Sequence, residues 1–289
     1  MRIDITAMFA CLDDFSKAYE ASERSRLLPR QGRRERAGYL SLGEMLLIVV
    51  LYHFSAYKDF KHFYQYGVCK EYRDCFRQLP CYERFIQLLP RLFVPLCMVF
   101  HALKGEETGI YFVDSTCLPV CHNNRRYKNK VFKGVAESSK STMGWFYGFK
   151  LHLVTNHKGE IVALKITKGN VDDRDVLDDM TAHLTGKIAA DKGYISPSLF
   201  KKLYARGLHL IVGIRKNMKN HLMPTFDKWL LRKRHLIETT NGILKCDMDI
   251  SHTRHRSPQN AFVHIIATIV AYAFKTNKPH LKTKILSIA

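Results

Sequence analysis

The segment Ile110-Tyr-Phe-Val-Asp-Ser-Thr116 decides the fold class, because a run of β-prone apolar residues ends at an acidic side chain. A second short apolar run, Lys187-Ile-Ala-Ala190, is followed at once by Asp191. Strand ends of this kind can present a carboxylate at the edge of a sheet. A third acid, Glu238, lies in a helical stretch. We therefore interpret Asp114, Asp191 and Glu238 as three carboxylates that two strands and a helix bring to one site.

These three acids form the oxygen-donor set that hard divalent cations prefer, so Mg²⁺ is expected and Mn²⁺ is a possible substitute. In two-metal phosphoryl transfer, a carboxylate commonly bridges two ions that lie about 3.5–4 Å apart. We expect two ions per active site, with Asp114 as the bridging ligand and with Asp191 and Glu238 each completing the shell of one ion. Taken singly, each acid could instead end a strand, form a turn or lie on a helix surface.

The charge of the chain indicates its partner. Its 289 residues include 46 Lys and Arg against 26 Asp and Glu, a formal net charge of +20. This excess predicts a polyanion, and an acidic island within it suits metal-dependent phosphodiester chemistry on DNA. A membrane partner is not expected, because the most apolar segment, Met45 to Tyr52, is far shorter than the ~20 residues of a spanning helix. With no continuous apolar stretch near the N-terminus, we expect a cytoplasmic protein.

The residues around the first two acids alternate between strand and helix patterns. The expected order is strand, hairpin, helix, strand, helix, strand, helix, with strands at 110–113, 148–155, 161–167, 187–190 and 208–214. This is the order of the ribonuclease H-like α/β fold, in which carboxylates from the first strand, the fourth strand and a later helix meet at one edge of the sheet. The predicted fold class is therefore α/β with a ribonuclease H-like catalytic core.

The flanking regions read as helical. Ser41 and Glu44 form a capping-box pattern before an apolar run, so a helix should begin there. Pro90 and Pro95 are expected to break the next helical stretch into pieces. The apolar rhythm of 258–275 predicts a C-terminal helix that packs on the catalytic core. The predicted domains are a helical N-terminal domain, 1–104, which binds DNA ends, and a catalytic domain, 105–289, which includes the C-terminal helix.

Basic residues are concentrated in two places. The segment 122–133 interleaves cations with Tyr127 and Phe132, which could stack on unpaired bases or belong to the core. Arg234 and Lys245 are spaced four and seven residues from Glu238, so on one helix the three fall on roughly one face. The expected DNA-binding residues are Arg125, Arg126, Lys128, Lys130, Lys133, Arg234 and Lys245.

Several motifs occur in the order typical of one family. They include Val-Asp-Ser-Thr-Cys-Leu-Pro-Val-Cys-His-Asn (113–123), Gly-Trp-Phe-Tyr-Gly-Phe-Lys-Leu-His-Leu (144–153), Gly-Asn-Val-Asp-Asp-Arg (169–174), Asp-Lys-Gly-Tyr-Ile-Ser (191–196) and Leu-Leu-Arg-Lys-Arg-His-Leu-Ile-Glu-Thr (230–239). With these motifs the chain resembles the DDE transposases of bacterial insertion sequences, specifically the insertion-sequence family numbered 982, related to the insertion-sequence 4 group. The resemblance covers most of residues 110 to 277.

The resemblance implies that Asp114, Asp191 and Glu238 fill the DDE roles. It implies Mg²⁺-dependent nicking at the terminal inverted repeats of a transposon, attack of the freed 3′ hydroxyl on double-stranded target DNA, and a homodimer on DNA. Arg234 and Lys245 match the Arg and Lys of the family's Tyr-Arg-Glu-Lys signature, whereas its tyrosine position holds Leu231. Two alternatives stay open: a nuclease of the same fold without strand transfer, and a repurposed DNA-binding protein without catalysis.

Overall fold

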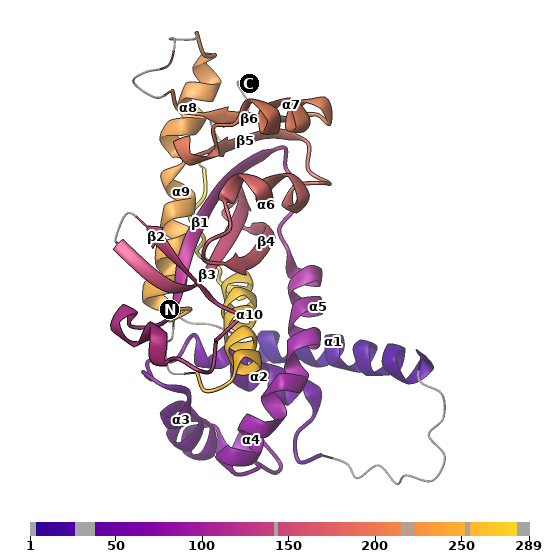
Figure 1. Cartoon of the computed structure of the whole chain (residues 1–289). Helices are drawn as coiled ribbons and strands as arrows, with labels where there is room; N and C mark the ends of the chain where they lie inside the picture. Colours follow the sequence, from indigo (N-terminus) through magenta and orange to yellow (C-terminus); the bar gives the residue numbers. More distant parts are fainter. Residues whose placement is uncertain are drawn as a thin grey trace. The chain divides into compact units, whose positions relative to one another are not determined.

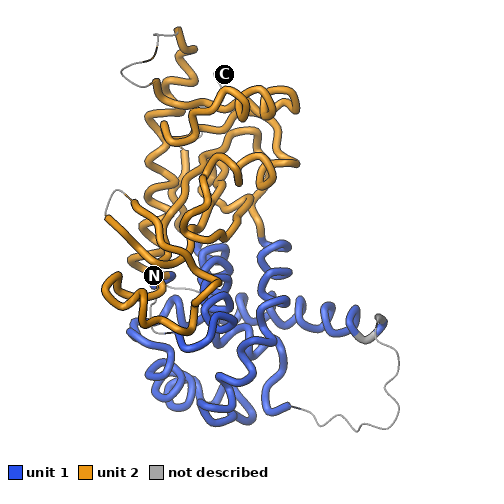
Figure 2. The backbone as a smooth tube through the Cα atoms, viewed as in Figure 1, with its two compact units in different colours: residues 1–103, 248–250, 255–275 blue, residues 104–247, 251–254, 276–289 orange. Residues whose placement is uncertain are grey.

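The computed structural model describes residues 4–26, 38–141, 144–214, 218, 222–251 and 255–281. The chain forms two compact units, which Figure 2 distinguishes by colour. Unit 1 comprises residues 1–103, 248–250 and 255–275, and unit 2 comprises 104–247, 251–254 and 276–289. Each unit therefore contains segments that are distant in the sequence.

The described part of unit 1 is helical, which confirms the prediction for the N-terminal region. Its elements are α1 (Ile5–Arg26), α2 (Leu42–Tyr52), α3 (Phe60–His62), the π-helical η1 (Phe63–Glu71), η2 (Arg73–Cys75), α4 (Tyr82–Leu88), η3 (Leu89–Leu92), α5 (Phe93–Leu103) and α10 (Pro258–Phe274). The predicted capping box begins α2: the backbone N–H of Glu44 donates to Ser41 Oγ at 3.1 Å, and that of Ser41 donates to Glu44 Oε2 at 2.6 Å.

The two prolines behave differently from each other. Pro90 lies in the 3₁₀ segment η3, between two α-helices, as expected of a helix breaker. Pro95 is the third residue of α5 and does not interrupt it, contrary to the sequence prediction. The first-turn N–H groups of a helix have no intrahelical acceptor, so a proline there removes no hydrogen bond.

One segment of unit 1 meets the length and composition of a membrane span. Tyr82–Leu103, across α4, η3 and α5, has 22 residues and is 28% buried. A single such segment is weak evidence for a span, because helices in the cores of soluble proteins pass the same test.

Helix α10 differs from its sequence prediction in where it packs. It contacts α5 and α2 and belongs to unit 1, although we expected it on the catalytic core. All residues from Ile265 to Tyr272 are buried. A helix that is apolar around its whole circumference needs enclosure by other helices, which one sheet face cannot supply.

Unit 2 is built on a mixed sheet. Its strands are β1 (Ile110–Cys121), β2 (Glu137–Ser141), β3 (Gly144–Asn156), β4 (Ile161–Lys168), β5 (Gly186–Ala190) and β6 (Leu208–Val212). The strand order is β2-β3-β1-β5-β6, with β4 also paired to β3. Strands β1 and β3 are antiparallel, whereas β5 is parallel to both β1 and β6. The predicted order of elements is confirmed, and β2 is an addition that the sequence pattern did not indicate.

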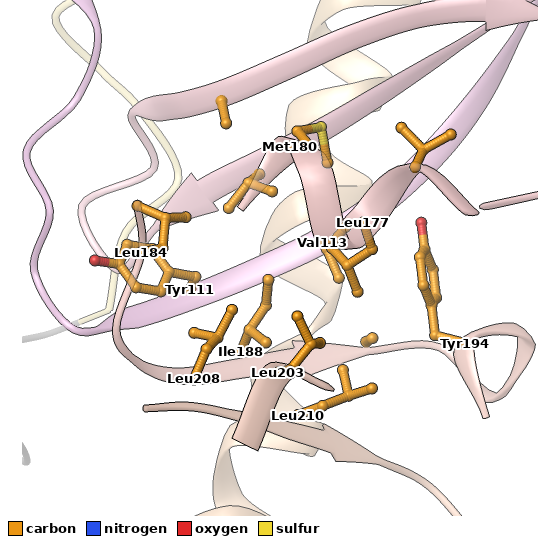
Figure 3. Packing of buried hydrophobic residues seen from close by; sticks show 14 of the residues in the cluster. Tyr111, Val113, Leu177, Met180, Leu184, Ile188, Tyr194, Leu203, Leu208 and Leu210 are labelled. Atoms are coloured by element: carbon orange, nitrogen blue, oxygen red, sulfur yellow. The ribbon is translucent and has the colours of Figure 1, made fainter. Parts of the chain in front are cut away.

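Helices cover the sheet on two sides (Figure 1). Helices α6 (Asp173–Met180) and α7 (Pro197–Ala205) close a core with the sheet, which Figure 3 shows from nearby. Helices α8 (Thr225–Lys233) and α9 (His235–Gly242) contact the sheet separately, and α9 runs along β1 and continues into the π-helical η6 (Ile243–Asp247). Because Tyr111 and Val113 belong to the core under α6 and α7, Asp114 points to the opposite face, toward α9.

Candidate active site

Asp114 is a half-buried carboxylate on β1, paired in register with Leu153 of β3. The side-chain amide of Asn241, on α9, donates to Asp114 Oδ2 at 3.0 Å. Burial raises the pKa of Asp114 to about 6, and the nearby charge of Glu238 adds to this increase. The backbone N–H of Ser115, the charge of Arg234 and the Asn241 amide all act in the opposite direction. This carboxylate therefore lies where a further positive charge would stabilise its ionised form.

Asp191 comes directly after β5, on the strand next to β1. Phe112 pairs with Ala189 in the parallel register, so Asp114 and Asp191 each lie two residues beyond that pair in the same direction. The side chain of Asp191 is 56% exposed. The two aspartates are therefore level on neighbouring strands, one half-buried and one open to solvent.

Glu238 is in the first turn of α9 and meets the other acids through Arg234. Arg234 Nη2 lies 2.6 Å from Glu238 Oε1 and 3.9 Å from Asp191 Oδ1. The same guanidinium lowers the pKa of Asp114 by its charge. Three carboxylates from β1, the end of β5 and α9 thus gather around one cation that is three-quarters buried, with 24% of its side chain exposed.

The donor chemistry of this cluster fits a divalent cation. Carboxylate oxygens are ligands for Mg²⁺ and Mn²⁺, and the Arg234 guanidinium stands where positive charge is needed. In the arrangement seen here, no three His, Cys, Asp or Glu side chains among the described residues are grouped closely enough to hold a metal ion. Glu238 is instead turned toward Arg234.

Of the two basic residues expected beside Glu238, only Arg234 contacts it. Arg234 lies at the junction of α8 and α9, where its N–H bonds to Leu231 O. Lys245 lies in η6, where the π-helical winding changes the angular spacing that a uniform α-helix would have. Burial raises the pKa of Cys117, and the charge of Lys245 opposes this, which places Lys245 along β1 near Cys117.

The predicted basic segment forms a 3₁₀ helix, η4 (Asn123–Lys128), and a following loop. Its cations Arg125, Lys128, Lys130 and Lys133 are exposed, and Arg126 is half-buried with its guanidinium 4.5 Å from the Tyr127 ring centroid.

The two aromatic residues of this segment have opposite environments. Tyr127 is 86% exposed, whereas Phe132 is 1% exposed and packs edge-on against Phe149 of β3. Tyr147 Oη also donates to Phe132 O at 2.9 Å, so the loop is anchored to the sheet at this point. Stacking of Phe132 on a base is therefore excluded, whereas Tyr127 is accessible.

Sequence reasoning missed the role of Asp173. Acids at the start of a helix are typical caps, and Asp172 caps α6 by accepting from the backbone N–H of Arg174. Asp173 instead accepts from Ser115 Oγ at 2.8 Å and from Lys150 Nζ at 3.1 Å. Ser115 follows Asp114 on β1, so Asp173 holds the strand from the face opposite the candidate site. The Asp-Asp doublet was the only available signal.

Tyr194 was also missed. It follows Asp191 by three residues and is 2% exposed within the core under α6 and α7 (Figure 3). Burial raises the pKa of its hydroxyl, and the charges of Asp173, Asp114 and Asp191 raise it further. Its ring therefore anchors the turn that carries Asp191.

The chain is similar to known proteins in sequence and in fold. The model of the family "Transposase DDE domain" matches residues 104–258. No curated protein has a significant match. Among solved structures, a piggyBac transposase synaptic complex with hairpin DNA aligns with a TM-score of 0.51 and 10% identity, over 94% of this chain and 75% of that chain. The Mos1 mariner paired-end complex with Mn aligns with a TM-score of 0.27 and 10% identity, over 91% and 88%.

At 10% identity the piggyBac likeness concerns the fold alone. In unit 2 the first strand, β1, is central, and β5 and β6 extend the sheet from it as parallel strands. The fold is ribonuclease H-like, as the element order predicted.

Proposed function

Because this chain belongs to the transposase DDE domain family, we propose that it cleaves DNA at the ends of an insertion sequence and joins those ends to target DNA. The observation that supports this proposal is the convergence of Asp114, Asp191 and Glu238, from β1, the end of β5 and α9, around Arg234. Three elements thus bring carboxylates to one cation, and these oxygen donors suit a divalent metal ion once Glu238 turns away from Arg234.

We propose that these three side chains hold two Mg²⁺ ions, with Mn²⁺ as a substitute. Asp114 would be the ligand shared by the ions, and Asp191 and Glu238 would each be a ligand of one ion. Bound there, the ions would activate a water or a 3′ hydroxyl as nucleophile and stabilise the leaving oxygen. Glu238 must leave Arg234 to take part, because the two are now 2.6 Å apart. The guanidinium that is released can then bind a DNA phosphate.

The DNA partner in this proposal is the double-stranded terminal inverted repeat, and then the target duplex. Exposed Arg125, Lys128, Lys130 and Lys133 bind backbone phosphate next to the sheet, with Arg126 behind them. Lys245 adds charge along β1. We further propose that the enzyme acts in the cytoplasm as a homodimer on DNA, that its helical region binds DNA ends, and that it belongs to the insertion-sequence family numbered 982.

The test is metal-dependent cleavage and joining of a labelled duplex that carries the element's terminal repeat. Asp191→Asn should retain DNA binding and lose cleavage by a factor of at least ~100, because it removes a ligand that is 56% exposed and leaves the fold intact. Asp175→Asn is the matched control, since it removes the same charge from an exposed position on α6. Cleavage that persists in Asp191→Asn would refute the assignment.

The alternative is a nuclease of the same fold, which would hydrolyse DNA without joining it. Water and a 3′ hydroxyl are activated by the same ions, so the site geometry suits either reaction. Joined products from the wild-type chain distinguish the two: their presence supports the transposase, and cleavage without joining supports the nuclease.

A further inference from the structure

Asn241 is a buried amide in direct contact with the candidate site. It follows Glu238 by three residues on α9, so both side chains lie on one face of the helix. Its side chain is almost fully enclosed, with 7% of the residue exposed. Its Nδ2 donates to Asp114 Oδ2 at 3.0 Å, across 127 residues of sequence. This bond therefore joins the strand that carries one acid to the helix that carries another.

The other end of the amide is in a different situation. Asn241 Oδ1 is buried and accepts no hydrogen bond from any described residue. An ionised carboxylate only accepts hydrogen bonds, so the amide nitrogen must face Asp114 and the oxygen must face away from it. A buried acceptor of this kind needs an explanation, because native structures leave few such groups without a donor.

Resting on the function proposed above, we propose that Asn241 is a positioning residue of the metal site. Its Nδ2 holds Asp114 Oδ2, which orients the carboxylate and leaves the other oxygen for the cation. Its Oδ1 would be available to accept from a donor that arrives with the hydrated cation. Removal of a residue that orients a metal ligand by a hydrogen bond typically lowers metal affinity by about 10–100-fold.

Electron paramagnetic resonance measures the binding of Mn²⁺ to the full chain in the absence of DNA. This measurement tests the role of Asn241 independently of enzymatic activity. Asn241→Ala should weaken Mn²⁺ binding at least ~10-fold, because Asp114 loses its orienting donor. Asn241→Leu removes both polar atoms without leaving the cavity that alanine would, so it should show the same loss. Binding of terminal-repeat DNA in EDTA should stay within about twofold of wild type, because neither variant removes a cation.

Thr240→Val is the matched control. Thr240 is the neighbouring residue on α9, is fully buried at 0% exposure, and donates to Leu236 O. Its loss should leave Mn²⁺ affinity within about twofold of wild type.

Four outcomes would overturn the role of Asn241. The first is a folded Asn241 variant that binds Mn²⁺ as tightly as the wild type, and the second is an equal loss of Mn²⁺ affinity in Thr240→Val. The third is unfolding of both Asn241 variants in a thermal melt, which would make the residue purely structural. The fourth is a loss of DNA binding that parallels the loss of Mn²⁺ binding. A wild-type chain that binds no Mn²⁺ would instead refute the proposed metal site itself, which separates the two failures.

Discussion

His152 is a buried side chain on the face of the sheet opposite Asp114. It lies on β3 opposite Ser115, is 1% exposed, and its Nε2 is 2.8 Å from Thr167 Oγ1. Burial lowers its pKa to about 4. Asp173 opposes this shift by its negative charge, and Lys150 and Lys165 add to it. His152 is therefore neutral at pH 7, although a carboxylate is near.

This shift predicts a pH dependence of folding. The pKa of His152 is about 4 in the folded chain and about 6.5 when unfolded, so between these values the unfolded chain binds more protons. The contribution of His152 to the free energy of unfolding is complete above pH 6.5. It decreases as the pH is lowered, by about 3 kcal/mol at pH 4. Urea unfolding from pH 7 to 4 should show a shallower decline in His152→Gln than in wild type. Equal slopes in the two proteins would contradict the assignment.

Asp114 contributes with the opposite sign over part of this range. Its pKa of about 6 exceeds that of an unfolded aspartate, so the folded chain binds more protons between pH 4 and 6. The contribution of His152 is therefore the difference between the pH dependence of unfolding free energy in wild type and in His152→Gln. The pH dependence of the wild type alone contains both groups and does not separate them. The raised pKa of Asp114 lowers the free energy of unfolding at neutral pH. Such a cost is expected for a carboxylate that is retained as a metal ligand.

At the scale of elements, Asp173 attaches the start of α6 to two strands. It accepts from Ser115 on β1 and from Lys150 on β3, and Lys150 Nζ also donates to Val171 O at 2.9 Å. The pair is partly buried, with 27% of the Asp173 side chain and 17% of the Lys150 side chain exposed. One carboxylate thus holds α6 against the strand that carries Asp114.

Asp173→Ala should therefore destabilise the protein by about 2–3 kcal/mol, because it leaves the partly buried charge of Lys150 without its counter-ion and removes an acceptor of Ser115. A double-mutant cycle with Lys150→Met should show a coupling of about 1 kcal/mol or more. Both are measured by urea unfolding. Asp179→Ala, on the same helix with a solvent-exposed ion pair to Lys165, is the control and should change little. Additive effects of Asp173 and Lys150 would show that the contact is not energetically linked.

At the scale of the whole molecule, a chain with a net charge of +20 contains a cluster of three acids. The cations of the η4 segment are exposed on an anchored loop, so they can reach phosphate without unfolding any element. Under the proposed function, long-range attraction to DNA belongs to these exposed cations, whereas the chemistry belongs to the three acids.

This division predicts a specific salt dependence. Lys128→Gln with Lys130→Gln should reduce the slope of log K for DNA binding against log salt concentration by about 2, since each lost phosphate contact contributes ~0.9. Lys201→Gln with Lys202→Gln removes the same charge from exposed positions on α7 and should leave the slope unchanged. Fluorescence anisotropy at several salt concentrations measures both. Equal reductions would mean that charge alone, without a defined surface, attracts DNA.

Local patterns in the sequence determined the order of strands and helices and the position of Asp191 directly after β5. Strand periodicity and the Ser41 capping box depend on neighbours along the chain, so they can be read without a structure. The expected end of the first strand at residue 113 was wrong: β1 continues to Cys121, so Asp114 is its fifth residue and is held within the sheet by pairing with β3. The helical character of the N-terminal region was predictable for the same reason.

Tertiary structure alone decided what lies next to these acids. Asn241 reaches Asp114 across 127 residues, Asp173 turns from a helix cap to a strand contact, and Phe132 enters the core. Helix α10 joins unit 1 because its buried circumference needs enclosure by α2 and α5. Each of these outcomes depends on packing between elements that are distant in sequence. No periodicity or motif records such packing, because burial and hydrogen-bond partners are chosen only when the elements meet.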